Sequence, residues 1–160
     1  MISEKLQKAI NDQIAVEMWS SNLYLSMSYF LRGKGYSGFS SWLKKRSEEE
    51  LIHAQQMADY LFKRGGNAFV KGIKDVPAEW KSPLEVFESV YTHEVTISGL
   101  IDKLVDVAST DKDKASQDFL WSFVREQVEE EDMARTAVEK LKISGDGGLF
   151  YVDSYFANIK

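Results

Sequence analysis

Four long segments of this chain repeat apolar residues at intervals of three and four, and this periodicity is the feature that most restricts its fold. Such spacing places the apolar side chains on one face of an α-helix. Clusters of glycine separate the segments, and the chain has only two prolines, Pro77 and Pro83. We therefore expect an all-α protein with helices over residues 4–32, 38–64, 83–110 and 113–142 and a short fifth helix over 148–157.

The connections between these helices restrict the topology further. The first and second helices, and likewise the third and fourth, are joined by a few residues, so each pair must form an antiparallel hairpin. The 16 residues from Asn67 to Ser82 have no periodicity, which is long for a connection in a compact domain. The second helix spans about 40 Å, and sixteen extended residues reach roughly 53 Å. We expect a single domain over residues 1–160, a four-helix bundle with one long crossover.

The start of the third helix is the best defined of these boundaries. Ser82 can cap the helix, and Pro83 suits the first helical position because its missing N–H would have no partner there. Glu85 stands three residues after Ser82, which is the spacing of a capping box. The third helix is therefore predicted to begin at Pro83.

The composition limits the classes of function. The 160 residues are 44% hydrophobic and contain no cysteine, so disulfides, thiolate metal sites and thiol nucleophiles are excluded. No apolar run approaches the ~18 residues of a membrane span, and no N-terminal leader is recognisable, so we expect a cytoplasmic protein without a membrane partner. The net charge of −5, with acid concentrated in residues 47–50 and 126–132, disfavours a nucleic-acid partner and suits a cation-binding protein.

Every long helix interrupts its apolar face near the middle with a side chain that can bind a metal. An ionised carboxylate buried alone costs several kcal/mol, so several of them together require cations. The first helix contributes Glu17, the second Glu50 and His53, the third Glu94, and the fourth Gln127 and Glu130.

Counting from the turns places these six side chains at one level of the bundle. Glu17 lies 18 residues before the centre of the first turn, taken as position 35, and Glu50 and His53 lie 15 and 18 residues after it. Relative to position 112, the same three distances recur at Glu94, Gln127 and Glu130. Because residues i and i+3 share one face of a helix, we expect Glu50 and His53 to face inward and the neighbouring Glu48 to face outward.

Four carboxylates and one imidazole would be neutralised by two divalent ions, with Glu50 the simplest bridge between them. Ligands of this kind, mostly oxygen with a single nitrogen, favour Fe(II) or Mn(II) over a closed structural zinc site. A buried polar network without metal is the alternative.

The chain resembles the ferritin family, and within it the non-haem ferritins of bacteria, over nearly its whole length. The matching features are Glu17, Tyr24, the EE-x-x-H motif at 49–53, Glu94, the EQ-x-EE motif at 126–130 and the terminal segment GGLFYVDSYF. The resemblance implies a ferritin-like fold and a hollow homo-oligomeric shell of 24 subunits. It also implies a ferroxidase that oxidises Fe(II) with O₂ or peroxide and stores a ferric mineral inside the shell.

The same resemblance assigns roles to individual residues. Glu17, Glu50 and His53 would hold one iron, and Glu50, Glu94 and Glu130 the second. Gln127 would act through hydrogen bonds near the first iron, and Tyr24 would lie beside the centre. Glu49, Glu126 and Glu129 match residues that form a third iron site together with Glu130.

Three departures from related patterns are informative. Bacterioferritins carry a second Glu-x-x-His, where this chain has Gln127 and Glu130, and they bind haem through a methionine at the position of Leu51, so no haem is expected. Several bacterial ferritins have histidine where this chain has Arg46, and a cation there would disfavour iron if it pointed inward.

His93 is turned about 100° from Glu94, and we expect it at the surface or an interface.

The fifth helix is apolar although the bundle is already complete, so we expect it to bury against other subunits.

Two other functions are alternatives to iron storage. A peroxide reductase of the rubrerythrin kind would need a more symmetric ligand set, and rubrerythrins add a cysteine-bound iron domain. A helical bundle with a purely structural or binding role would take up no stoichiometric metal.

Overall fold

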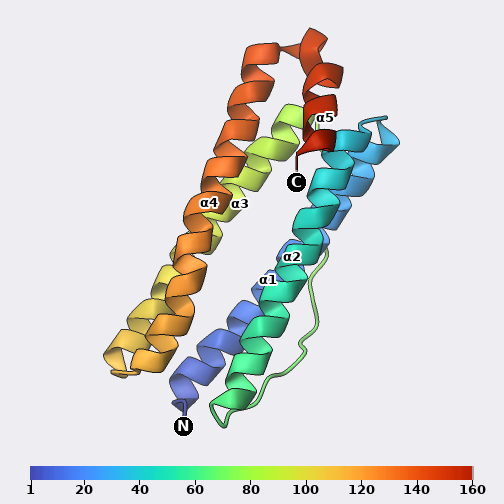
Figure 1. The fold of residues 1–160 in the computed structure, drawn as a ribbon. Helices are drawn as coiled ribbons and strands as arrows, with labels where there is room; N and C mark the ends of the chain where they lie inside the picture. Colours follow the sequence, from blue (N-terminus) through green and yellow to red (C-terminus); the bar gives the residue numbers. More distant parts are fainter. Residues whose placement is uncertain (160) are drawn as a thin grey trace.

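The structure is a computed structural model that describes residues 1–159, and it consists of four long helices, a 3₁₀ turn and a short fifth helix (Figure 1). The elements are α1 (Glu4–Gly33), α2 (Ser37–Lys63), α3 (Pro83–Thr110), α4 (Lys114–Ser144), η1 (Asp146–Gly148) and α5 (Leu149–Asn158). Each observed boundary lies within two residues of its expected position. The described residues contain no strand, and the all-α prediction is confirmed.

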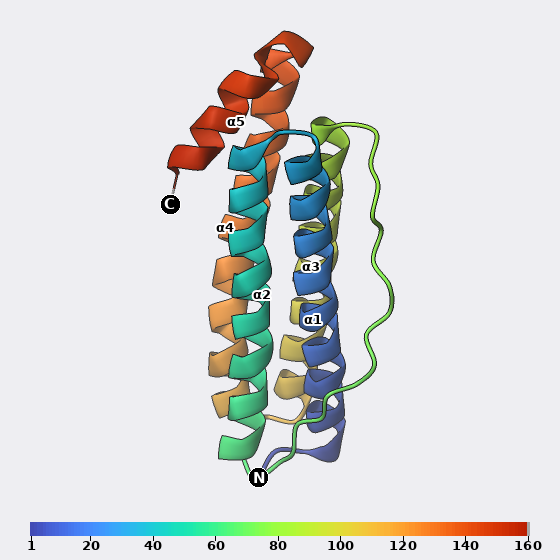
Figure 2. The same ribbon diagram turned by 90° about the vertical axis from the view of Figure 1, so that its right-hand side faces the viewer.

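The topology is that of a ferritin-like bundle with one long crossover. α1 packs along α2 and α3 along α4, as two antiparallel hairpins. The crossover between α2 and α3 runs from one end of the bundle to the other beside α1 (Figure 2). It is fixed to α1 by side chains of that helix: Asn11 donates to the carbonyl of Asn67 (2.9 Å) and Trp19 to that of Asp75 (3.4 Å). The sixteen residues without periodicity therefore do span the bundle.

Side-chain caps explain where α1 and α3 begin. The hydroxyl of Ser3 accepts from the N–H of Leu6, and the hydroxyl of Ser82 accepts from the N–H of Glu85, both at 3.1 Å. Each of these bonds satisfies an N–H that has no partner within its helix. The expected capping box is only half correct, because the Glu85 carboxylate accepts from the N–H of Lys81 instead of that of Ser82.

The buried apolar residues form two clusters separated by a polar layer. The cluster near the α1–α2 turn includes Met27, Leu31, Phe39 and Phe87. The cluster near the N-terminus includes Leu6, Ile10, Met57, Ile101 and Leu120. Both clusters are built from the helix faces that periodicity identified, and the residues that interrupt those faces lie between them. The middle of the bundle is thus a buried polar layer closed at both ends by apolar packing.

The fifth helix is partly integrated into its own chain, which corrects one expectation. Val152 and Phe156 of α5 are only 5% and 4% exposed, and the Phe156 ring centroid lies 5.5 Å from that of Trp42 and 5.3 Å from that of Phe87. The expectation that α5 buries its apolar side against other subunits is therefore wrong for these two residues. It stays a prediction for Phe150 and Tyr151, which are 69% and 82% exposed.

None of the helices in residues 1–159 has the length and apolar character needed to cross a membrane.

Candidate metal centre

The polar layer contains all six side chains that interrupt the apolar faces, together with Tyr24. Each of them is at most 7% exposed: Glu17, Tyr24, Glu50, His53, Glu94, Gln127 and Glu130. Glu48, next to them in sequence, is exposed, as the helical spacing requires. α1 to α4 thus all contribute to one buried group of side chains.

Glu17, Glu50 and His53 lie close enough to share one ion. One potential ligand atom from each of them lies within 4.8 Å of the others, and no further such group of three occurs among the described residues. Gln13 donates its side-chain N–H to Glu17 Oε1 at 3.0 Å, whereas Glu17 Oε2 is buried and has no hydrogen-bond partner. Because an unpaired buried oxygen is costly, this atom is suited to a cation that enters the group.

Burial and close spacing also affect the pKa values of the Glu17 and Glu50 carboxyl groups. Burial, followed by the negative charge of Glu50, raises the pKa of Glu17 well above its usual value. Burial also raises the pKa of Glu50, against the opposing effect of a hydrogen bond with His53. A divalent ion would relieve both effects, because it would compensate the charge that the low-dielectric interior disfavours.

His53 is held between two carboxylates. Its Nδ1 lies 3.1 Å from Glu50 Oε2, and its Nε2 lies 2.8 Å from Glu126 Oε1. Burial lowers the pKa of His53, but the hydrogen bonds with Glu126 and Glu50 outweigh it and raise the pKa to about 11. When Nδ1 faces an ion beside Glu50, Nε2–H can donate to Glu126, and this contact fixes the tautomer and the ring orientation.

Glu94 is fully engaged by other side chains of the layer. The Tyr24 hydroxyl donates to Glu94 Oε1, and the Gln127 amide donates to Glu94 Oε2 at 3.0 Å. Burial raises the pKa of Glu94 despite these two hydrogen bonds. Gln127 also contacts the Ser98 hydroxyl at 3.2 Å. The geometry thus places Tyr24 and Gln127 as donors that orient one carboxylate.

Glu130 of α4 is the fourth buried carboxylate of the layer. Burial, followed by the charge of Glu94, raises its pKa to about 7, whereas Arg46 acts in the opposite direction. Arg46 Nη1 lies 3.8 Å from Glu130 Oε1. The arginine that the sequence analysis singled out therefore does point inward.

The three acidic residues expected at a third site are not gathered around one point. Glu49 accepts from Arg46 Nη2 at 3.1 Å, and Glu126 accepts from His53. Glu129 is exposed. In this structure Glu49 and Glu126 instead support side chains of the buried layer, so their role as ligands remains a prediction.

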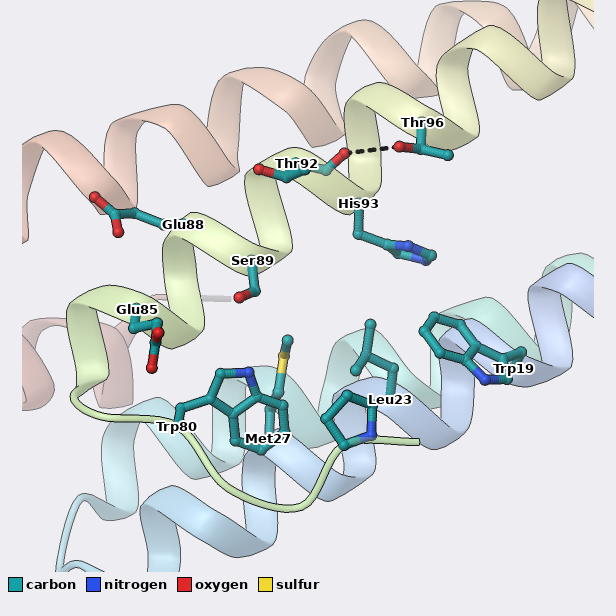
Figure 3. Close-up of a pocket in the computed structure, with 11 residues that line it drawn as sticks. Trp19, Leu23, Met27, Trp80, Glu85, Glu88, Ser89, Thr92, His93 and Thr96 are labelled. Atoms are coloured by element: carbon teal, nitrogen blue, oxygen red, sulfur yellow. Dashed lines mark hydrogen bonds between the residues drawn. The ribbon is translucent and has the colours of Figure 1, made fainter. Parts of the chain in front are cut away.

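His93 lies beside the centre and is partly buried, and its expected place at the surface or an interface stays a prediction. It projects from α3 toward Trp19 at the edge of a groove of about 440 Å³, which the crossover residue Trp80 borders at its other end (Figure 3). Its Nε2 lies 2.7 Å from the Ser20 hydroxyl, and its ring packs edge-on against Tyr24 at 5.8 Å. Burial lowers the pKa of His93 to about 4. His93 is thus a neutral packing residue behind Tyr24.

Two contacts in this layer were not foreseen from the sequence. Gln13 stands on the apolar face of α1 one turn before Glu17. Its position in the sequence could therefore have predicted that it donates a hydrogen bond to the Glu17 carboxylate. The bond between Glu126 and His53 had no such signal, because it joins α4 to α2 and depends on the rotation of both helices.

The fold and this layer define the class of protein. Residues 7–144 match the sequence profile of the ferritin-like domain. The chain belongs to the ferritin family.

Individual relatives and structures agree with this assignment. The chain is 61% identical to a bacterial non-heme ferritin of Bacteroides fragilis strain 638R, over 96% of this chain and 97% of the relative. It is 37% identical to a bacterial non-heme ferritin of Campylobacter jejuni, over 99% of this chain and 96% of the relative. A crystal structure of an open pore ferritin from Archaeoglobus fulgidus superimposes with a TM-score of 0.97 at 41% identity, covering 100% of this chain and 99% of that one.

Proposed function

We propose that this protein stores iron and is a ferroxidase, which oxidises Fe(II) at a dinuclear centre in the middle of each bundle. The observation that carries the proposal is the buried group of Glu17, Glu50 and His53, with ligand atoms within 4.8 Å of one another and an unpartnered oxygen on Glu17. Family membership supports iron as the ion. The donor set supports it independently, because carboxylates with a single imidazole suit Fe(II).

Two substrate ions would occupy adjacent positions. Glu17, Glu50 and His53 would bind the first, and Glu94 and Glu130 would bind the second, with Glu50 reaching both. Tyr24 and Gln127 would keep Glu94 oriented, since both already donate to it. Two Fe(II) ions lose one electron each, and O₂ takes up these two electrons and two protons to give H₂O₂. Peroxide is the alternative oxidant. Fixed ligand geometry is the protein's contribution to such chemistry.

The proposal includes a cytoplasmic hollow shell of 24 subunits in which the oxidised iron collects as a mineral. Exposed large apolar side chains support association, among them Tyr29, Val128, Phe150 and Tyr151, all at least 62% exposed. Homo-oligomers generally close with point-group symmetry, and the structural relatives are ferritins. A third iron position at Glu49, Glu126 and Glu129 would be filled only after these side chains leave their present partners.

Stopped-flow absorbance tests the dinuclear centre. The protein is mixed with about two Fe(II) per subunit in oxygenated buffer, and the fast oxidation phase is recorded. Glu50→Ala removes the proposed bridge and is expected to abolish that phase, and His53→Ala is expected to reduce it strongly. Glu48→Ala is the matched control, because it removes an exposed carboxylate from the same acidic run. A Glu50→Ala protein that oxidises iron as fast as the parent would overturn the proposal.

A further inference from the structure

Arg46 is a buried cation that the proposed chemistry does not use. It is 7% exposed, and no other lysine or arginine within residues 1–159 is buried. It stands on α2 one turn before Glu50, so its side chain enters the same face of the helix. Burying a charge is costly unless partners compensate it. The contacts of the Arg46 guanidinium therefore indicate which groups compensate its charge.

The guanidinium is directed at two carboxylates of the acidic layer. Nη2 donates to Glu49 at 3.1 Å, and Nη1 lies 3.8 Å from Glu130. Nη1 also contacts the Met133 sulfur at 3.7 Å, and Cζ lies 5.0 Å from the centre of the Trp42 ring. Nε is buried without a partner.

The approach of Arg46 to Glu130 makes the two proposed metal positions unequal. Glu17, Glu50 and His53 already converge. Glu130 instead faces a fixed positive charge, and Glu94 is held by Tyr24 and Gln127. An ion between Glu94 and Glu130 would have to draw Glu130 away from Arg46 and then remain near that cation. An ion at the first position meets neither obstacle directly.

We propose that Arg46 is a positioning residue that holds Glu130 in the metal-free protein and thereby weakens the second metal position relative to the first. The inference rests on the proposed function, because it assumes a centre that takes two divalent ions. It concerns the arginine of this chain and assigns to it the difference in affinity between the two positions.

Isothermal titration calorimetry with Zn(II) on the metal-free protein tests this without any oxidation. The parent is expected to show one tight and one weaker site per subunit. Arg46→Gln removes the charge and frees Glu130, so the weaker site is expected to tighten by about tenfold or more, since a unit charge within several ångströms of a divalent ion acts strongly in the interior. The tight site is expected to change much less. Arg46→Lys keeps a charge and is expected to keep the second site weak.

Two further variants keep the test decisive. Arg46→Met preserves packing on Trp42 and Met133 without a charge, so it serves if Arg46→Gln does not fold, and it is expected to tighten the second site equally. Arg135→Gln removes an exposed arginine of α4 that pairs with Glu139 and is expected to change neither site. Two equal sites in the parent, an unchanged second site in both charge-free variants, or the same gain in Arg135→Gln would overturn the inference. A parent that binds no Zn(II) would instead count against the proposed dinuclear centre.

Discussion

Glu17 is the side chain of this layer that a cation would stabilise most directly. One of its oxygens accepts from Gln13, and the other is buried without a partner. Burial and the adjacent Glu50 raise its pKa, so the carboxylate form is unfavourable when no cation is present. A side chain held in this way lowers the stability of the metal-free protein and contributes to metal binding.

Replacing Glu17 by glutamine should therefore have opposite effects on the stability of the metal-free protein and of the Zn(II)-bound protein. Metal-free Glu17→Gln is expected to be at least as stable as the parent, because a neutral amide avoids the cost of a buried carboxylate. Zn(II) at 100 times the dissociation constant of the first position should stabilise the parent by about 2.7 kcal/mol through that position, and this part of the gain should largely disappear in Glu17→Gln. Melting curves with and without Zn(II) measure both, with Glu48→Gln as the control. A metal response as large in Glu17→Gln as in the parent would contradict the first position.

At the scale of elements, the start of α2 is completed by α5. α2 has no side-chain cap of its own, and the Asp153 carboxylate of α5 accepts from the N–H of Phe39 at 2.8 Å. Gly38 allows this approach, because a Cβ there would lie 1.8 Å from the Asp153 carbonyl oxygen. The two helices thus meet at a point where any larger residue would clash with backbone.

Gly38→Ala is accordingly expected to displace α5. Hydrogen exchange should become faster in residues 149–158, and the protein should lose stability. Gly99→Ala is the matched control, because Gly99 is also helical but a Cβ there meets nothing within 4 Å. Alanine is about 0.5–1 kcal/mol better than glycine within a helix, so this control should be neutral or stabilising. Equal exchange in α5 of both variants would show that the contact is unimportant.

Asp113 at the start of α4 gives a prediction for pH. Its carboxylate accepts from the N–H of Ser116 and from Arg64 Nη1, both at 3.0 Å. Burial acts to raise its pKa, but these partners outweigh burial and lower it below 3.8. The stabilisation is therefore complete above pH 3.8 and is lost as the pH falls through the lower folded-state value.

Asp113→Ala should cost about 1–2 kcal/mol at pH 7, and urea unfolding at pH 7 and at about pH 3 measures the change. The difference from the parent should shrink as the pH falls below 3.8, because the Asp113 carboxylate of the unfolded parent then takes up a proton more readily than that of the folded parent. Asp113→Asn keeps a capping oxygen without the charge and separates the two contributions. A cost that is independent of pH would mean that the charge contributes nothing.

At the scale of the whole molecule, α5 presents two different faces. Phe156 packs in the apolar cluster of its own chain, whereas Phe150 and Tyr151 remain exposed. Removal of residues 146–160 would therefore expose Phe39, Trp42 and Phe87 as well as remove a contact surface. Such a deletion would not separate assembly from folding.

Substitution of the exposed face alone should make that separation. The double change Phe150→Ser and Tyr151→Ser is expected to reduce assembly of the proposed 24-subunit shell while the helical content and the melting of the single chain change little. Light scattering and circular dichroism measure the two properties, and Ser154→Ala, a change of another exposed α5 residue, is the control. A parent that remains monomeric or dimeric at micromolar concentration would contradict the shell itself.

The sequence by itself determined the helices, their pairing and the buried level at which the acidic side chains lie. Periodicity identifies which side chains face inward, and chain length between turns sets depth along a helix of fixed rise. These properties are local, so no knowledge of neighbouring helices was needed for Glu17, Glu50 or Glu94. The placement of the crossover followed equally from its length.

Only the tertiary structure decided how those side chains pair. The bond from His53 to Glu126, the approach of Arg46 to Glu130 and the neutral environment of His93 each depend on the rotation and spacing of two helices. The division of α5 into a buried and an exposed face depends on where it meets α2. A small shift or rotation of one helix against another makes or breaks such a contact. A sequence pattern, in contrast, indicates only which face of a helix a side chain occupies and at what level along the helix it lies.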